Sequence, residues 1–178
     1  MDQPSIALIY GTDTNNTEEV GTKIVNQWKE LGIDVEMHNV KDIEINQLEN
    51  YEMLILGIPT WDFGGIQEDW EELGDALSEL SLADKTIALY GLGDQFGYGD
   101  YFVDAMGWLY EKLAPTQATF IGEWPTEGYE FEASRACIKD KEHFVGLAID
   151  EDQQFELTDQ RIEQWVIQLY AERAVEAA

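Results

Sequence analysis

The most constraining feature of this sequence is a regular alternation of short apolar runs with segments of helical periodicity. The runs Ile6–Tyr10, Met53–Ile58 and Thr86–Tyr90 are almost continuously apolar, as strands covered on both faces must be. Between these runs, apolar residues recur three or four positions apart. The alternation predicts a parallel sheet with helices on both faces, which is the doubly wound α/β class.

The remaining elements are expected from the same patterns. An outer strand is expected over Asp34–Val40, and a fifth strand begins at Thr119–Gly122 and resumes at Phe144–Ala148. The expected helices carry the apolar faces Val20, Ile24, Trp28 and Leu31; Trp70, Leu73, Leu77 and Leu80; Phe102, Ala105, Met106, Leu109 and Leu113; and Ile162, Trp165, Val166, Leu169 and Tyr170. The fifth strand is therefore interrupted by an irregular excursion.

Length and composition favour a single cytoplasmic domain. With 178 residues and 44% apolar content, the chain suffices for one well-buried domain, residues 1–178, and is short for two. No apolar run approaches the roughly 20 residues that cross a bilayer, and the first residues lack the basic region of a signal peptide. Cys137 is the only cysteine, so we expect it to be a reduced thiol.

The charge balance excludes two classes of partner. The chain has 37 acidic and 10 basic residues, a formal net charge of -27. Nucleic acids and anionic membranes are bound chiefly through Lys and Arg, so neither is an expected partner. Two interpretations of the acidity remain open: a solvated surface, as in a salt-rich habitat, or a field that steers a basic protein partner.

Three loops of unusual composition leave the carboxyl ends of the expected strands, where open α/β sheets bind ligands. We name them the threonine loop (Gly11–Thr17), the tryptophan loop (Ile58–Gly65) and the tyrosine loop (Gly91–Asp100). The threonine loop combines three hydroxyl groups with a helix N-terminus, and both can hold phosphate. It has no Lys or Arg and no GxxxxGK[ST] pattern, so a single phosphate monoester is favoured over a nucleoside triphosphate. A turn that only caps the helix is the alternative.

The other two loops each present an aromatic side chain at the same edge of the sheet. Trp61 lies in PTWDFGG, and Tyr98 lies between two glycines in GLGDQFGYGD. A large aromatic residue exposed on a glycine-rich loop is unfavourable unless something stacks on it. The loops together predict a planar heterocycle between Trp61 and Tyr98, tethered by a phosphate in the threonine loop.

Several motifs give the chain a resemblance to a known family. The segments TDTNNT, GIPTWDFGGIQEDW, YGLGDQFGYGDYFVDAMG, EWPTEGYEFEAS, FVGLAIDEDQ and LTDQRIEQWV resemble the long-chain bacterial flavodoxins, most closely the B-type second flavodoxin. This resemblance implies a flavodoxin-like three-layer sandwich with a five-stranded parallel sheet of order 2-1-3-4-5. It implies noncovalently bound FMN and low-potential one-electron transport by an acidic flavoprotein. The excursion at about 124–143 resembles the long-chain insertion that splits strand five.

The resemblance also implies which residues contact FMN. The implied set is Thr12, Asp13, Thr14, Asn15, Asn16 and Thr17 at the phosphate; Pro59, Thr60, Trp61, Asp62, Phe63 and Gly64 in the tryptophan loop; Gly93, Asp94, Gln95 and Tyr98 in the tyrosine loop; and Asp150 near the ribityl chain. Trp61 and Tyr98 match the residues that stack on the flavin. The family usually has glycine where this chain has Asn15, and asparagine tolerates a left-handed conformation better than other non-glycine residues.

The resemblance and the charges of the loops together indicate how the redox chemistry is tuned. A neutral semiquinone is expected, with the peptide between Asp62 and Phe63 turning its carbonyl toward the flavin. A phosphate held without a cation, together with Asp62 and Asp94, opposes further negative charge on the ring. Each ~1.4 kcal/mol of such destabilisation lowers a one-electron potential by about 59 mV. We therefore expect a strong reductant. For an electron carrier of this kind we expect no catalytic residues and no metal.

The expected partners are redox proteins. A monomer is expected to dock transiently with a basic ferredoxin/flavodoxin-NADP reductase and with low-potential acceptor enzymes. The acids expected at the flavin rim are Glu68, Asp69, Glu71, Glu72 and Asp100. A receiver domain is disfavoured because acids are missing directly after strands one and three. An FMN-dependent NAD(P)H:quinone oxidoreductase is the stronger alternative, although the acidic rim suits an anionic nicotinamide poorly.

Overall fold

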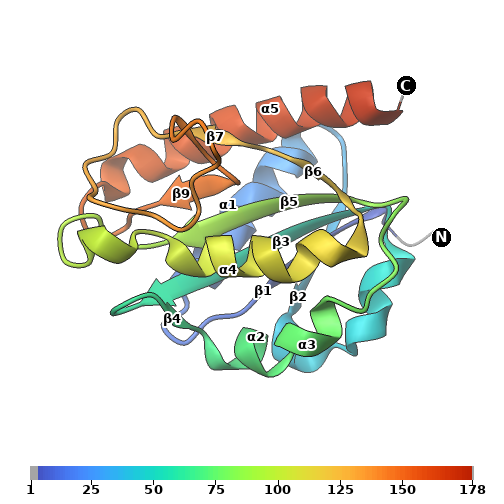
Figure 1. The fold of residues 1–178 in the computed structure, drawn as a ribbon. Coiled ribbons are helices and arrows are strands. Elements are labelled where there is room, and N and C mark those ends of the chain that lie inside the picture. Colours follow the sequence, from blue (N-terminus) through green and yellow to red (C-terminus); the bar gives the residue numbers. More distant parts are fainter. Residues whose placement is uncertain (1–3, 178) are drawn as a thin grey trace.

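The structure, a computed structural model, describes residues 4–177 (Figure 1). Its strands are β1 (Ile6–Tyr10), β2 (Val35–Asn39), β3 (Met53–Trp61), β4 (Gly65–Ile66), β5 (Thr86–Leu92), β6 (Thr119–Ile121), β7 (Trp124–Pro125), β8 (His143–Phe144) and β9 (Leu147–Ile149). Its α-helices are α1 (Asn16–Glu30), α2 (Glu68–Glu72), α3 (Gly74–Leu77), α4 (Asp104–Leu113) and α5 (Thr158–Ala177). Within the described residues, no helix combines the length and apolarity needed to cross a membrane.

The main sheet has the predicted doubly wound order. Its strands lie in the order β2-β1-β3-β5-β6, and all of these neighbours are parallel. The order reverses between β1 and β3, so the carboxyl ends of these strands flank the crevice in which this class of sheet binds ligands. This confirms the expected order 2-1-3-4-5.

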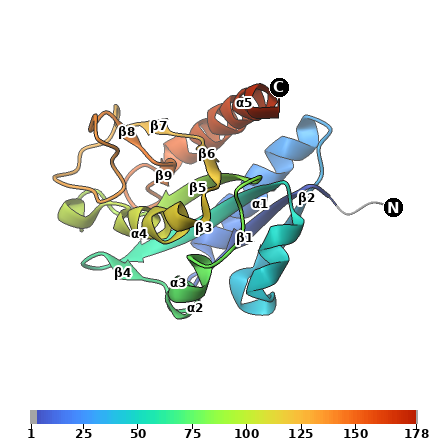
Figure 2. The same cartoon turned by 45° about the vertical axis from the view of Figure 1, so that its right-hand side comes forward.

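Alternate residues of each central strand enter two separate cores. Ile6 and Leu8 pack with α1 and α5 on one face, whereas Ala7 and Ile9 belong to the core beneath α2, α3 and α4. Figures 1 and 2 show these helices on the two sides of the sheet. Burial on both faces explains why the strands are almost continuously apolar in the sequence.

Strand five is split as predicted, but it resumes at Leu147 rather than at Phe144, because Phe144 belongs to β8 and pairs with β7. β6 and β9 both pair in parallel with β5, and the excursion between them carries the small antiparallel pair β7–β8. The excursion lies at the upper left of Figure 1, above the start of α4. Gly146 allows the strand to resume, because a Cβ at this position would lie 2.0 Å from the carbonyl oxygen of Leu89.

Two predicted elements differ in detail. The single helix expected from Trp70 to Leu80 is wrong, because the chain forms two short helices, α2 and α3, that meet at Leu73 and Gly74. Gly74 packs so closely on Trp108 that a Cβ would lie 3.1 Å from the ring, which brings the second helix against α4. Trp61, expected on a turn, ends strand β3 because β4 pairs antiparallel with Thr60 and Trp61.

Candidate functional site

A cleft of about 270 Å³ opens where the three loops meet at the carboxyl edge of the sheet. Its lining comprises Thr14, Asn16, Thr17, Pro59, Thr60, Trp61, Asp62, Leu92, Gly93, Asp94, Tyr98, Glu151 and Asp152. All three loops contribute to this lining, as the sequence predicted. No Lys or Arg is among these lining residues, so the cleft presents hydroxyls, backbone groups, aromatic rings and carboxylates.

The threonine loop leads into the N-terminus of α1 through a left-handed residue. Asn15 adopts the left-handed conformation, with φ 70° and ψ −5°, directly before the first residue of α1. The N-terminal N–H groups of this 15-residue helix therefore face the loop, where the helix dipole favours negative charge. The αL geometry of Asn15 is the one that glycine adopts most readily, so asparagine preserves the turn.

Two polar atoms of the loops lie buried without a protein partner. The Thr12 hydroxyl and the Trp61 indole N–H have no hydrogen-bond partner within the described part of the chain. A buried donor without a partner costs free energy that a ligand can recover. The hydroxyl of Thr12 beside the helix N-terminus thus fits a ligand phosphate, and the residues present fit the expected cofactor.

The tyrosine loop is shaped by Asp94. Its carboxylate accepts hydrogen bonds from the N–H groups of Phe96 at 3.0 Å and Gly97 at 2.8 Å, and from the Gln153 amide at 3.0 Å. Partial burial opposes ionisation of Asp94, but these three donors outweigh it and lower its pKa. The loop that presents Tyr98 is consequently closed around an ionised carboxylate.

The two aromatic residues expected to stack on a ligand both line the cleft. Trp61 is half-buried at the end of β3, and Tyr98 is 37% exposed in the tyrosine loop. Hydrogen bonding to the Asp62 carboxylate, followed by its charge, raises the pKa of Tyr98. The phenol therefore stays neutral at physiological pH.

Seven of the expected cofactor residues do not line the cleft directly. They are Thr12, Asp13, Asn15, Phe63, Gly64, Gln95 and Asp150. Asp13 accepts a hydrogen bond from the Gln67 amide at 3.4 Å, and Phe63 is 76% exposed on the hairpin before β4. Gly64, with φ 86°, forms the turn of that hairpin.

Gln95 and Asp150 are buried beneath the cleft rather than exposed in it. Asp150 is fully buried, and its carboxylate accepts hydrogen bonds from the backbone N–H groups of Gln95, Asp152 and Gln153. Gln95 is 2% exposed and contacts Asp150 again through its side-chain amide. These contacts hold the tyrosine loop against the end of β9.

Three residues that line the cleft were not predicted from the sequence: Leu92, Glu151 and Asp152. The signal was the acidic run Asp150–Asp152 directly after β9, of which only the first residue was considered. Partial burial raises the pKa of Glu151, with Lys23 acting in the opposite sense. Burial, then the neighbouring Asp94 and Asp150, raises the pKa of Asp152. Of the acidic run after β9, Glu151 and Asp152 line the cleft, whereas Asp150 is buried.

The sheet and this cleft define a class of protein, a doubly wound α/β domain with a ligand-sized cleft at the carboxyl ends of its strands. The flavodoxin family model matches residues 8–165, and the chain belongs to the flavodoxin family. The long-chain resemblance inferred from the motifs is confirmed.

Curated relatives match over nearly the full chain. Flavodoxin 2 of Escherichia coli (strain K12) is 49% identical over 171 residues, which are 96% of this chain and 97% of the relative. Flavodoxin 1 of Salmonella typhimurium is 46% identical over 166 residues, or 93% and 92% of the two chains. Among solved structures, the Fusobacterium nucleatum flavodoxin bound to flavin mononucleotide is 30% identical, with a TM-score of 0.88 over 96% of this chain and 99% of that chain.

Proposed function

We propose that FMN binds in the cleft with its phosphate in the threonine loop and its ring between Trp61 and Tyr98. As a flavodoxin, the chain is an FMN-based electron carrier rather than an enzyme with its own substrate. Bound FMN supplies reversible electron transfer. The observation that carries the placement is the buried Thr12 hydroxyl without a partner, beside the left-handed Asn15 and the N-terminus of α1.

The proposed contacts fall into three groups. Thr12, Asp13, Thr14, Asn15, Asn16 and Thr17 surround the phosphate; Pro59, Thr60, Trp61, Asp62, Phe63 and Gly64 meet one side of the ring; and Gly93, Asp94 and Tyr98 meet the other. Gln95 and Asp150 support the tyrosine loop from below through hydrogen bonds. Glu151 and Asp152 join the set because they line the same cleft.

The charges around the cleft favour a strong reductant. Asp62, Asp94, Glu151 and Asp152 line the cleft, and no Lys or Arg does so. Negative charge near the ring opposes the uptake of an electron, and it acts more strongly in a partly buried site than in water. Because no cation is among the lining residues, the reduction potential of the bound flavin is lowered. For the same reason, helix dipoles and hydroxyl groups bind the phosphate.

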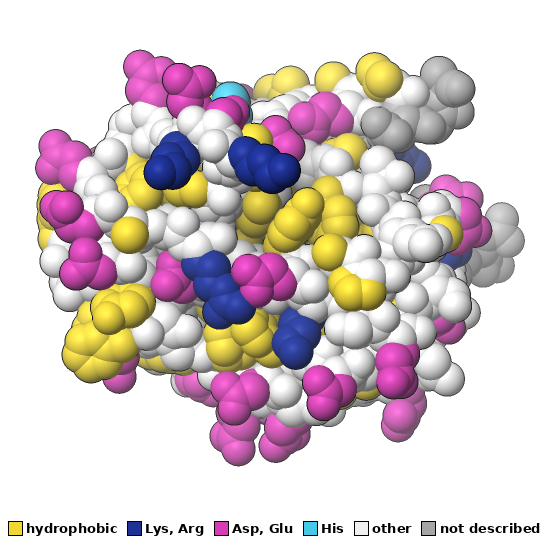
Figure 3. Space-filling view, viewed as in Figure 1, with side chains coloured by type: hydrophobic (Ala, Val, Ile, Leu, Met, Phe, Trp, Pro, Cys, Tyr) yellow, Lys and Arg dark blue, Asp and Glu magenta, His cyan; other side chains and the backbone are white. Residues whose placement is uncertain are grey.

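We infer that redox partners dock transiently at the acidic rim, which consists of Glu68, Asp69, Glu71, Glu72 and Asp100. Helix α2 follows the β4 hairpin directly, and its first turn contains Glu68, Asp69 and Glu71. Figure 3 shows acidic side chains along the left and lower edges of the molecule, and also on its upper and right edges. Such a field attracts a basic partner and accelerates encounter.

A basic ferredoxin/flavodoxin-NADP reductase is the proposed donor, and low-potential enzymes are the proposed acceptors. We further propose that residues 1–178 act as one cytoplasmic, monomeric domain. An NAD(P)H:quinone oxidoreductase is not favoured, because the relatives that match the whole chain are named flavodoxins.

The decisive experiment compares FMN with riboflavin as ligands of the apoprotein. Fluorescence titration should give one FMN per chain and an affinity for FMN at least about tenfold higher than for riboflavin, because only FMN carries the phosphate. Equal affinities would contradict the phosphate placement. A protein that binds neither ligand would contradict the proposed function.

A further inference from the structure

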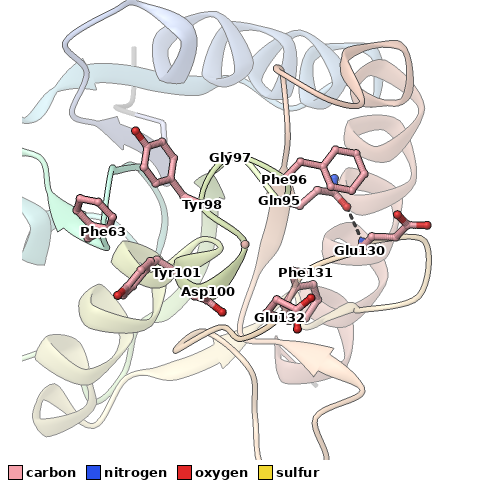
Figure 4. A pocket seen from close by; sticks show the side chains of 11 residues that line it. Phe63, Gln95, Phe96, Gly97, Tyr98, Asp100, Tyr101, Glu130, Phe131 and Glu132 are labelled. Atoms are coloured by element: carbon pink, nitrogen blue, oxygen red, sulfur yellow. Dashed lines mark hydrogen bonds between the residues drawn. The ribbon is translucent and has the colours of Figure 1, made fainter.

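A second hollow, of about 440 Å³, lies beside the FMN cleft and shares Tyr98 with it. The hairpin before β4, the tyrosine loop and the insertion all contribute to its wall (Figure 4). Its lining is Phe63, Gln95, Phe96, Gly97, Tyr98, Gly99, Asp100, Tyr101, Glu130, Phe131 and Glu132. The site assigned to FMN leaves most of these residues without a role.

Four exposed aromatic side chains line the hollow. Phe63 is 76% exposed and Phe96 is 60% exposed, and Tyr98 and Tyr101 are also exposed. Phe63 contacts both tyrosine rings edge-on, with centroids 5.8 Å and 5.7 Å apart. Figure 3 shows exposed hydrophobic side chains gathered beside the β4 hairpin. Patches of this kind on a soluble domain mark binding surfaces.

Carboxylates surround the same aromatic surface. Asp100, Glu130 and Glu132 line the hollow, and all three are exposed. None of them forms an ion pair with any residue in the described part of the chain, and no Lys or Arg is among the lining residues. The hollow therefore combines aromatic faces with negative charge that is not neutralised.

Backbone hydrogen bonds hold the two sides of the hollow in place. The carbonyl of Gly99 accepts hydrogen bonds from the N–H groups of Glu132 at 2.9 Å and Ala133 at 3.0 Å. The Gln95 side-chain oxygen accepts the N–H of Glu130, as the dashed line in Figure 4 marks. Phe131 anchors the insertion by packing on Phe102 and Phe144 in the core, with centroids 5.4 Å from each. A preformed site binds without the cost of ordering its own loops.

We propose that this hollow receives an arginine side chain from the redox partner. A guanidinium group stacks on aromatic rings and pairs with carboxylates through two N–H groups at once, whereas an ammonium group is a strongly hydrated point charge. The proposal rests on the proposed electron-carrier function, because the shared Tyr98 places a bound arginine next to the flavin cleft. The insertion thereby supplies one wall of the partner site.

The test uses the FMN-loaded protein, uniformly labelled with ¹⁵N, and two small probes of equal charge, N-acetylarginine amide and N-acetyllysine amide. The arginine probe should shift the backbone amides of Gly97, Gly99 and Glu132 in a saturable way. The lysine probe should bind about threefold or more weakly. Shifts scattered over the acidic surface, or equal binding of the two probes, would overturn the proposal.

Two variants test separately how the carboxylates and the aromatic rings of the hollow contribute to binding of the arginine probe. Glu130→Gln with Glu132→Gln, and separately Phe96→Leu, should each weaken the arginine probe about threefold or more. The matched control is Glu30→Gln with Glu79→Gln, two exposed acids at the opposite edge of the sheet. Equal effects of the control and hollow variants would show that the probe is bound only by general charge attraction. That result would refute the site.

The flavin spectrum distinguishes this failure from failure of the proposed function. These variants leave the residues assigned to FMN unchanged, so each protein should keep its full FMN content and visible spectrum. A protein that holds FMN but does not bind the arginine probe would refute only the proposal that the hollow binds arginine. A wild-type protein that holds no FMN refutes the proposed function itself.

Discussion

The buried carboxylate of Asp150 accepts two hydrogen bonds from Gln95, one from the backbone N–H at 3.0 Å and one from the side-chain amide at 2.8 Å. The remaining oxygen of the Gln95 side chain accepts the N–H of Glu130. One buried glutamine therefore joins the end of β9, the tyrosine loop and the insertion. Its role in the site is to support the surface that Tyr98 occupies.

Replacing Gln95 with leucine should loosen this junction. The variant removes a donor from the buried Asp150 and leaves the Glu130 N–H without its acceptor, at a cost of about 1–3 kcal/mol. We expect the apoprotein of this variant to unfold at a lower urea concentration than the wild type and to bind FMN more weakly. Gln164→Leu, at an exposed position of α5, is the control and should change neither. Unchanged stability in the Gln95 variant would show that the junction is not needed.

Replacing Thr12 with valine tests the phosphate site. Valine has nearly the shape of threonine but removes the buried hydroxyl that lacks a protein partner. We expect the affinity for FMN to fall about tenfold, as for the loss of one hydrogen bond to a charged group, while riboflavin affinity stays unchanged. Fluorescence titration measures both. Thr22→Val on the exposed side of α1 provides the control, and an equal loss for riboflavin would place Thr12 away from the phosphate.

Asn15 should be replaceable by glycine but not by alanine. Its φ of 70° lies in the left-handed region, which costs an alanine roughly 1–2 kcal/mol and glycine almost nothing. We expect Asn15→Ala to lower the free energy of unfolding of the apoprotein by about 1 kcal/mol, with Asn15→Gly staying within about half of that. Urea denaturation measures the difference, and two equally stable variants would exclude strain at this position.

A cation in the cleft should make the protein a weaker reductant. Asp152→Lys replaces a negative lining residue with a positive one and thereby favours an electron on the bound flavin. Potentiometric titration should show a potential higher by a few tens of millivolts, since about 1.4 kcal/mol corresponds to 59 mV. Glu163→Lys on the outer surface of α5 carries the same charge change and should have little effect. Equal shifts in both variants would mean that net charge alone sets the potential.

The acidic rim should control the rate of reduction by a partner. We expect Glu68→Lys with Glu72→Lys to slow electron transfer from a basic ferredoxin/flavodoxin-NADP reductase and to weaken its salt dependence, with FMN affinity nearly intact. Charge attraction mainly accelerates encounter and is screened beyond about 8 Å at physiological salt. Stopped-flow kinetics at several salt concentrations provides the measurement.

The comparison protein for this rate is Glu30→Lys with Glu79→Lys, which changes the same charge at the opposite edge of the sheet. Its rate should remain near that of the wild type. If both double variants are slowed alike, docking does not take place at the rim of α2.

The sequence by itself determined the parallel sheet and the loops of the site, and the resemblance of its motifs to a family implied the strand order. Hydrophobic periodicity is local, so β1, β3 and β5 could be identified from their own residues, and the left-handed turn at Asn15 was already suggested by its residue type. Once the strands were assigned, the topology placed the three loops at one edge. The family motifs then added the cofactor.

Only the tertiary structure decided how residues far apart in the chain combine. The break between α2 and α3 depends on the contact of Gly74 with Trp108, and the burial of Gln95 depends on Glu130 in the insertion. Neither contact leaves a periodic signal, because each joins segments separated by more than 30 residues. The second hollow arises in the same way, since its walls meet only after the insertion packs on the tyrosine loop.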